Sequence, residues 1–223
     1  MAKKYVVFDL DGTLIDSIPD LYQEINLFLA DHGRRPLTEK EATDSIGFGA
    51  RNMLCNAFRL TGEPLSEEQI PDYLALWIRQ YSHARMDLTR TWPGVPETLA
   101  KMKDEGYHMA VCTNKPEGPT DAILKKLNLR RFFETVLHAD SLPLRKPHPE
   151  PLWEAVRRMG GTNAESVMVG DSEADAEAAR HAGFPIILLS FGYAHIPLDE
   201  IAPDVLIDSF DMLPDVLKKT IDF

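Results

Sequence analysis

The chain has little cysteine and no long apolar run. Its 223 residues include only two cysteines, Cys55 and Cys112, so no disulfide framework is implied and a reducing compartment fits. No apolar run approaches the roughly 20 residues that a membrane-spanning helix needs. The short run before Asp9 is interrupted by acidic residues too early to serve as a signal peptide. These absences predict a cytoplasmic protein that does not associate with membranes.

Positive charge is also scarce. Lysine and arginine number 24 against 35 aspartates and glutamates, a formal net charge of -11. Proteins that bind nucleic acid normally carry a basic face, so we expect no nucleic-acid partner. An anionic ligand would be repelled at long range, and a few local cations and backbone amides would have to hold it.

Strand-like and helix-like segments alternate along most of the chain. Apolar runs typical of buried strands occupy residues 5–10, 108–113, 135–139, 166–171, 185–190 and 204–209. Helix-like segments lie between most of them, at residues 95–106, 120–129, 149–161 and 173–183. This alternation predicts an α/β fold with a doubly wound, Rossmann-like parallel sheet. In such sheets the functional residues lie at the carboxyl ends of the strands.

The segment from residue 18 to residue 91 breaks this alternation, because only helical patterns occur in it. Apolar stripes run along residues 20–33, 50–58 and 70–86, and we interpret them as the interior of a helical bundle rather than a cofactor site. The prediction is a catalytic core formed by residues 1–17 and 92–223 and a helical cap formed by residues 18–91. A cap inserted directly after the first strand is expected to cover the end of that strand, as a lid would.

Polar residues follow three of the predicted strands. They are Asp9 and Asp11 after the first, Thr113 and Asn114 after the second, and Asp171 after the fourth, with Asp175 one helical turn later. Carboxylates that converge on one crevice repel one another unless a cation lies between them, and oxygen ligands suit Mg²⁺. The histidines at positions 108, 138 and 148 do not have the spacing of a zinc site. The pattern therefore favours magnesium.

Asp9, and a lysine further along the chain, Lys146, have simpler interpretations. Asp9 could be an ordinary turn aspartate, because aspartate is common after strands. Lys146, which stands beside Pro147, could be a solvated surface lysine rather than a cation directed into the crevice.

Four short motifs resemble those of the haloacid dehalogenase-like superfamily of phosphotransferases, which use an aspartate nucleophile. "DLDGTLIDS" is similar to the first motif, "CTN" to the second, the lysine of "KPHPEP" to the third and "GDSEADAEAA" to the fourth. The motifs occur in the order and spacing of the family, and the resemblance covers essentially the whole chain. It implies an enzyme that acts on a small phosphorylated metabolite with Mg²⁺ as cofactor.

The resemblance also implies a role for each matching residue. Asp9 would attack phosphorus to form an aspartyl-phosphate, and Asp11 would protonate the leaving oxygen and later activate water. The implied Mg²⁺ ligands are the Asp9 and Asp171 carboxylates and the Asp11 backbone carbonyl, with Asp175 and Ser172 supporting them from outside. The implied phosphate contacts are Thr113, the Asn114 backbone amide and Lys146.

Within the superfamily, several segments look most like the phosphoglycolate phosphatases. They are "WPGVPETLAKMKDEG", "CTNKPEGPT", "KPHPEPLWEAVRRMGG", "GDSEADAEAARHAGFP" and "FGYAH". The segment "LHADSLPLRKP" departs from that pattern because it lacks paired glycines. The expected reaction is hydrolysis of 2-phosphoglycolate to glycolate and phosphate. The alternatives are a related phosphatase or nucleotidase, a pyrophosphatase, a phosphomutase like β-phosphoglucomutase, and a phospho-receiver signalling module.

In the cap, the turn "GFGAR" is a candidate contact for the substrate. Gly47 and Gly49 flank a turn before a predicted helix, and backbone amides at a helix start attract anions. Arg51 would add a positive charge for the carboxylate of phosphoglycolate. The alternative is a helix-start turn with a surface arginine. The oligomeric state is not predicted.

Overall fold

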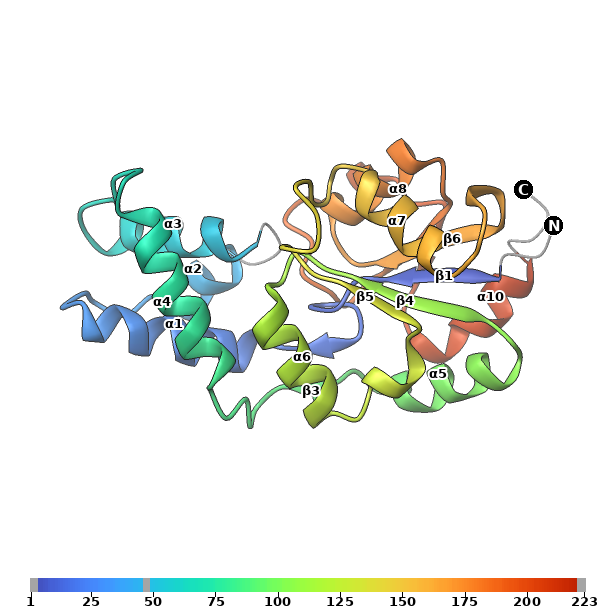
Figure 1. Ribbon diagram of the computed structural model, residues 1–223, viewed down its shortest axis with the longest axis horizontal. Coiled ribbons are helices and arrows are strands. Elements are labelled where there is room, and N and C mark those ends of the chain that lie inside the picture. Colours follow the sequence, from blue (N-terminus) through green and yellow to red (C-terminus); the bar gives the residue numbers. More distant parts are fainter. Residues whose placement is uncertain (1–3, 46–48, 220–223) are drawn as a thin grey trace.

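The structure is a computed structural model, of which residues 4–45 and 49–219 are described. A sheet of six parallel strands lies at its centre, in the order β5-β4-β1-β6-β7-β8 (Figure 1). The strands are β1 (Tyr5–Phe8), β4 (His108–Cys112), β5 (Thr135–Leu137), β6 (Ser166–Gly170), β7 (Ile186–Leu189) and β8 (Val205–Ile207). All six predicted strands are present, and the predicted parallel, doubly wound fold is confirmed.

Helices cover both faces of this sheet, since successive strand residues point to opposite sides. Val6 and Phe8 pack into one core cluster, whereas Val7 packs into the other. The first face is covered by α5 (Val95–Asp104), α6 (Glu117–Lys126), η1 (Arg130–Phe132), η3 (Phe210–Met212) and α10 (Leu213–Lys219). The second is covered by α7 (Glu150–Arg158), α8 (Glu173–Ala182) and α9 (Leu198–Ile201), and η2 (Asn163–Glu165) precedes β6.

One of these helices starts earlier than its sequence pattern indicates. Helix α6 begins at Glu117 rather than at Thr120, because Pro116 takes the N-cap position. Pro119 lies in the first turn, where its missing N–H leaves no helical hydrogen bond unmade. The apolar pattern of the segment begins only after this turn.

The helical segment packs as a separate lobe at the left of Figure 1. It consists of α1 (Ile18–Asp31), α2 (Glu39–Thr43), α3 (Ala50–Thr61) and α4 (Ile70–Ser82), of which α2 was not predicted. The expected stripes of α1 and α3 are buried, among them Ile25, Phe28 and Phe58. Helix α4 buries Trp77 and Tyr81, while Tyr73 is partly buried. We retain the division into a core and a cap at residues 18–91 as our interpretation of this arrangement.

Two short linkers join this lobe to the sheet. They pair as the antiparallel strands β2 (Ile15–Asp16) and β3 (Arg90–Thr91). Asp20 at the start of α1 is buried and accepts hydrogen bonds from the Leu88 and Thr89 backbone amides and from the Thr89 hydroxyl, at 2.5 to 3.0 Å. The carboxylate therefore ties the returning linker to the first cap helix, close to the end of β1.

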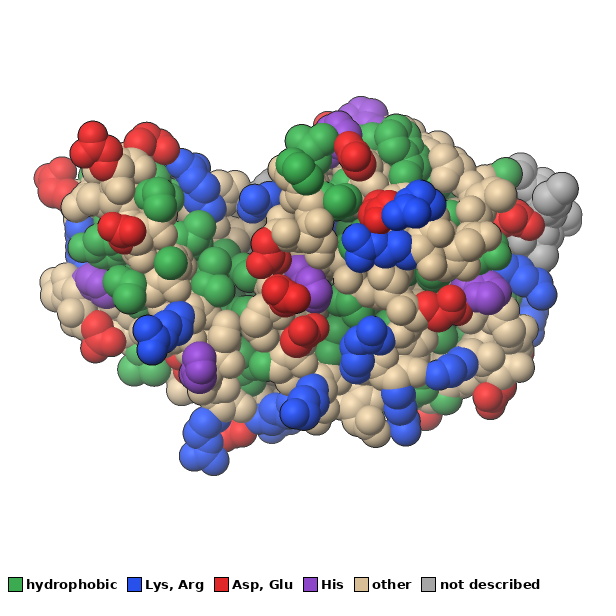
Figure 2. Space-filling model, in the orientation of Figure 1, with side chains coloured by type: hydrophobic (Ala, Val, Ile, Leu, Met, Phe, Trp, Pro, Cys, Tyr) green, Lys and Arg blue, Asp and Glu red, His purple; other side chains and the backbone are tan. Residues whose placement is uncertain are grey.

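Acidic and basic side chains are interspersed over both lobes on the face shown in Figure 2. Within the described residues, no helix combines the length and the apolar character required to cross a membrane.

Candidate active site

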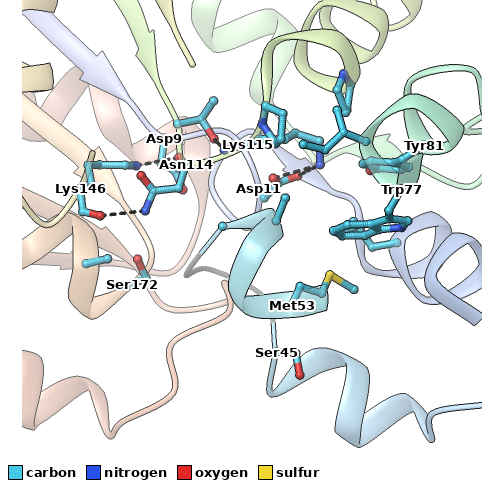
Figure 3. A pocket seen from close by; sticks show the side chains of 18 of the residues that line it. Asp9, Asp11, Ser45, Met53, Trp77, Tyr81, Asn114, Lys115, Lys146 and Ser172 are labelled. Carbon is cyan, nitrogen blue, oxygen red and sulfur yellow. Dashed lines mark hydrogen bonds and ion pairs between the residues drawn. The ribbon is translucent and has the colours of Figure 1, made fainter. Parts of the chain in front are cut away.

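A pocket lies between the carboxyl edge of the sheet and the helical lobe (Figure 3). The core contributes Asp9, Asp11, Thr113, Asn114, Lys115, Pro116, Pro119, Lys146, Ser172, Ala174 and Asp175. The cap contributes Leu21, Ser45, Gly49, Ala50, Met53, Trp77, Ile78 and Tyr81. The structure thus brings most of the sequence-predicted site residues to one pocket. The interpretation of the cap stripes as bundle interior is confirmed by their burial, and two of the buried residues, Trp77 and Tyr81, also line the pocket.

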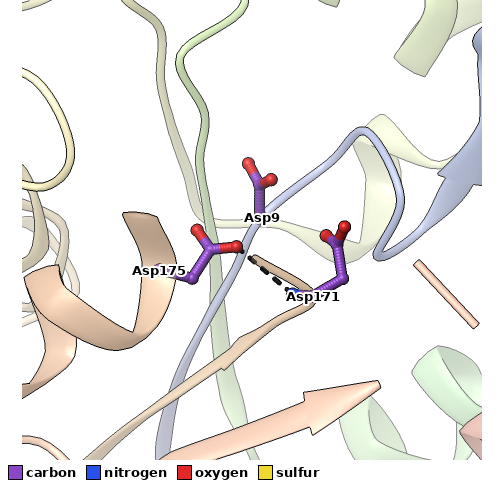
Figure 4. Close-up of side chains that lie close together, drawn as sticks. All are labelled: Asp9, Asp171 and Asp175. Atoms are coloured by element: carbon purple, nitrogen blue, oxygen red, sulfur yellow. Dashed lines mark hydrogen bonds between the residues drawn. The ribbon is translucent and has the colours of Figure 1, made fainter. Parts of the chain in front are cut away.

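Three carboxylates gather at one end of the site (Figure 4). One oxygen each from Asp9, Asp171 and Asp175 lies within 4.8 Å of the others. Asp9 directly follows β1, Asp171 directly follows β6, and Asp175 lies in the first turn of α8. Parallel pairing of β1 with β6 brings the two strand ends side by side.

Small residues make room for this cluster. Gly12 has φ +85°, which L side chains rarely adopt, and a Cβ there would overlap the Asp171 carboxylate. A Cβ at Gly192, in the segment that follows β7, would also overlap the Asp171 side chain. Asp171 is held in place because its two oxygens accept hydrogen bonds from the Thr13 hydroxyl at 2.6 Å and the Tyr193 amide at 2.7 Å.

Burial and mutual repulsion make the charged form of these acids costly. Burial raises the pKa of Asp9 to about 7, although the ammonium of Lys146 acts in the opposite direction. Burial and the neighbouring carboxylates of Asp175 and Asp9 raise the pKa of Asp171 well above its usual value. A divalent cation between the oxygens would offset both effects.

The donor set fits Mg²⁺, because every candidate ligand is an oxygen. Asp175 already uses its oxygens, one for Lys146 at 2.6 Å and the other for the amide and hydroxyl of Ser172 at 3.2 and 2.7 Å. Among the described residues, each oxygen of Asp171 accepts only one hydrogen bond and keeps a lone pair, whereas Asp175 Oδ2 accepts three. Asp9 and Asp171 are therefore the carboxylates better placed to bind an ion directly, with Asp175 and Ser172 in the outer layer. The set of Mg²⁺ ligands that the family resemblance implies stays a prediction.

Lys146 is buried, with 4% of its surface exposed, so its interpretation as a solvated surface lysine is wrong. Its ammonium lies 2.8 Å from Asp9 Oδ1 and 2.6 Å from Asp175 Oδ1. The two carboxylates raise its pKa against the effect of burial, so the group stays charged. The side-chain amide of Asn114 donates to the Lys146 carbonyl at 3.0 Å and joins this segment to the end of β4.

Asp11 turns its side chain away from the carboxylate cluster. Its oxygens accept hydrogen bonds from the ammonium of Lys115 at 3.0 and 3.1 Å, and from the hydroxyl of Ser17 at 2.5 Å. The Asp11 side chain is thus engaged outside the carboxylate cluster, and the role of its backbone carbonyl as a metal ligand stays a prediction.

Sequence reasoning missed Lys115, although it quoted the "CTNK" segment that contains it. The residue follows Thr113 and Asn114 at the end of β4, and a lysine at the carboxyl end of a central parallel strand is the signal that could have found it. It also missed Thr13 and Tyr193. The Tyr193 hydroxyl contacts the linker, since it donates to Asp16 at 2.6 Å and accepts from the Ser17 amide at 3.0 Å.

Of the described residues in the cap turn "GFGAR", only some lie at the pocket. Gly49 lines the pocket, but Arg51 does not. The guanidinium of Arg51 instead donates to Glu67 at 2.7 Å, and 45% of its side-chain surface is exposed. Gly47 lies outside the described residues.

Comparisons with known proteins agree with this architecture. The family model for haloacid dehalogenase-like hydrolases matches residues 6–189. A phosphoglycolate phosphatase of Caulobacter vibrioides is 39% identical, with 94% of this chain and 88% of that protein covered. That of Agrobacterium fabrum is 38% identical, with 95% and 91% covered. A crystal structure described as a predicted phosphoglycolate phosphatase from Haemophilus somnus superposes with a TM-score of 0.89 at 32% identity, covering 96% of this chain and 97% of that one.

Proposed function

The chain belongs to the haloacid dehalogenase-like hydrolase family and is a phosphatase, and from this premise we propose that it hydrolyses 2-phosphoglycolate through an aspartyl-phosphate at Asp9. The observation that carries the proposal is the pocket, where Asp9, Asp11 and Lys146 meet at one edge of the sheet. Relatives at 38–39% identity that carry the name phosphoglycolate phosphatase support the choice of substrate.

In the first step, a carboxylate oxygen of Asp9 attacks phosphorus, and the bond from phosphorus to the ester oxygen breaks. Asp11 gives a proton to the leaving oxygen, which departs as the hydroxyl of glycolate. In the second step, Asp11 takes a proton from water, the water oxygen attacks phosphorus, and the bond from phosphorus to the Asp9 oxygen breaks, which releases phosphate and restores the Asp9 carboxylate. Both acids line the same pocket, as this exchange requires.

Three groups are proposed to stabilise charge on the phosphoryl oxygens. They are the Thr113 side chain, the Asn114 backbone amide and the Lys146 ammonium. Thr113 and Lys146 are each 4% exposed, and their interaction with charge is stronger because little water screens it. Lys146 also holds Asp9 at 2.8 Å, which orients the attacking oxygen.

Mg²⁺ is the proposed cofactor, held by the Asp9 and Asp171 carboxylates and the Asp11 backbone carbonyl. When bound, the ion neutralises negative charge on the phosphoryl group and the carboxylates. Thr13 and the Tyr193 amide keep Asp171 directed at this position. Asp175 and Ser172 support it from outside.

The pocket favours a small substrate. The cavity has a volume of about 60 Å³, which is room for several water-sized groups. Met53, Trp77 and Tyr81 close the cap side with apolar surface. A sugar or a nucleobase would have to displace these side chains.

A hydrolysis panel tests the proposal. The esters are 2-phosphoglycolate, glucose 1-phosphate, glucose 6-phosphate, a nucleoside monophosphate and pyrophosphate, each assayed with Mg²⁺ and with EDTA. We expect Mg²⁺-dependent phosphate release and the highest kcat/KM for phosphoglycolate. Conversion of glucose 1-phosphate to glucose 6-phosphate would point to a phosphomutase. If another ester has the highest kcat/KM, the proposal of phosphoglycolate as substrate is wrong. If no ester releases phosphate, the proposed phosphatase activity is wrong.

A further inference from the structure

Two lysines are found among the described residues that line the pocket, and they occupy different places. Lys146 lies among the carboxylates that are proposed to hold metal and phosphate. Lys115 lies on the other side of Asp11, beside the cap (Figure 3). Its ammonium is 4.8 Å from the centre of the Tyr81 ring in α4. The proposed phosphate site accounts for Lys146 but gives Lys115 no role.

Burying an ammonium costs free energy, because the group loses its hydration and must be compensated by nearby acceptors. Lys115 is 5% exposed, and its pairing with Asp11 keeps it charged. Positioning Asp11 is not a sufficient reason, since the Ser17 hydroxyl already holds that carboxylate at 2.5 Å. An ammonium has three N–H donors. Two hydrogen bonds go to Asp11, and the third donor lies on the side of Tyr81, where a substrate acceptor would compete with the phenol for it.

None of the described cap residues that line the pocket is a cation. The Arg145 guanidinium of the core lies near Gly49, 4.0 Å from where a Cβ on that glycine would be, but Arg145 does not line the pocket. The cap residues that line it are apolar or neutral, from Leu21 to Tyr81. Arg51, the cation expected there, is paired with Glu67 outside the pocket. A substrate with its phosphate at Lys146 and a second anionic group directed at the cap therefore meets Lys115.

We propose that Lys115 is a specificity-determining residue that binds the carboxylate of the substrate, so that the pocket selects phosphate monoesters of small hydroxy acids. This inference rests on the proposed function and deepens it. The core lysines would then divide the substrate between them, with Lys146 on the phosphate and Lys115 on the carboxylate. The apolar cap surface between Met53 and Tyr81 would exclude water from the second ion pair and strengthen it.

Binding of two stable analogues tests the assignment without relying on turnover. The first is 3-phosphonopropionate, which has phosphonate and carboxylate ends, and the second is propylphosphonate, which has a methyl group in place of the carboxylate. Their dissociation constants are measured by calorimetry on the Mg²⁺-loaded protein. The ratio of the two constants isolates the carboxylate, because any effect through Asp11 or the metal acts on both phosphonates.

In the unchanged protein we expect 3-phosphonopropionate to bind more tightly than propylphosphonate by about 10- to 100-fold, as for a hydrogen-bonded charge pair in a desolvated site. Lys115→Met should bring the ratio close to one. The matched control is Lys125→Met, which removes an exposed lysine from α6 and should leave the ratio unchanged. Lys115→Gln keeps a polar group beside Asp11 and should also bring the ratio close to one. If Lys115→Met does not fold, this second variant still tests the role of Lys115.

The outcomes separate this inference from the proposed function. A strong preference that survives in both Lys115 variants overturns the role of Lys115 and leaves phosphoglycolate standing as substrate. Equal weakening of both analogues, with the ratio kept, means that Lys115 acts only through Asp11 and also overturns it. No preference in the unchanged protein overturns carboxylate recognition, and phosphoglycolate as substrate with it.

Discussion

The core and the cap contribute unlike surfaces to the same pocket. The core contributes acids and lysines from the ends of its strands, whereas the described cap residues contribute apolar side chains, a serine and a glycine. In the core, oppositely charged groups from different segments pair with one another, as Lys146 does with Asp9 and Asp175. In the cap, aromatic rings pack on one another, as Trp77 does on Tyr81 at 6.3 Å.

From this difference we expect the core to set the rate of the reaction and the cap to set the preference among substrates. Substitutions among the charged core residues should slow the reaction of every ester, because they remove groups that are proposed to act on phosphorus. Substitutions in the cap should change which ester reacts best, because they alter the size of the space around the leaving group. Lys115 is the exception, because it belongs to the core but its ammonium lies beside Tyr81 of the cap. It is therefore expected to affect the preference among substrates.

The largest effect is expected for Asp9→Asn, which keeps the shape of the side chain and removes its negative charge. We expect kcat to fall by at least about 10⁴-fold for all esters, as for removal of a nucleophile elsewhere. Phosphate release measures this, and circular dichroism checks that the fold survives. Asp104→Asn, an exposed change at the end of α5, is the matched control and should retain full activity. Near-normal rates in Asp9→Asn would contradict the covalent mechanism.

Asp11→Asn should have a smaller effect that depends on the leaving group. With phosphoglycolate, whose alkoxide needs a proton, we expect a loss of about 10²- to 10⁴-fold. With nitrophenyl phosphate, whose leaving group needs little protonation, the loss should be clearly smaller. Steady-state kinetics with both esters measures the difference. Equal losses would remove the general acid from the mechanism.

A cap substitution should instead alter selectivity. Trp77 is 2% exposed and lines the pocket, and Trp77→Leu enlarges the space beside it. We expect kcat/KM for phosphoglycolate to fall about tenfold and that for glucose 6-phosphate to fall less or rise, since one buried contact is worth roughly this much. Trp153→Leu, at a tryptophan that is 40% exposed on α7, controls for loss of an indole. An unchanged ranking of esters would show that the cap does not select by size here.

The smallest expected effect is a pH-dependent shift in thermal stability. Asp9 has a pKa of about 7 in the folded protein and near 3.8 as a free group. Between these values the folded protein holds a proton that the unfolded chain has lost, so the stability of the metal-free protein falls as pH rises. Mg²⁺ binds the deprotonated carboxylates, so its addition should raise Tm by a few degrees at about pH 8 and by less at about pH 5.

Thermal melts in Mg²⁺ and in EDTA at both pH values measure this shift. Asp171→Asn should reduce the difference between the two melts, because it removes a proposed ligand. An equal gain in Tm at both pH values would contradict binding at the carboxylate cluster.

The core was predictable because its signals are local. A strand buried on both faces needs a continuous apolar run, so its end shows as an abrupt change to polar residues, as at Asp9 and Asp171. The short pair β2 and β3 was not predictable, because strands of two residues show no periodicity. The stripes on the cap helices predicted burial correctly. They did not show that the buried face of α4 continues into a pocket, since periodicity does not distinguish the two surroundings.

By itself, the sequence determined the parallel sheet and the convergence of acidic side chains at the ends of its strands. Only the tertiary structure decided which partner each charged side chain takes. Lys115 pairs with Asp11, 104 positions away, while Arg51 turns to Glu67 and leaves the pocket. Long cationic side chains reach several competing acceptors, and the choice among them depends on the burial and charge supplied by segments that meet only when the chain is folded.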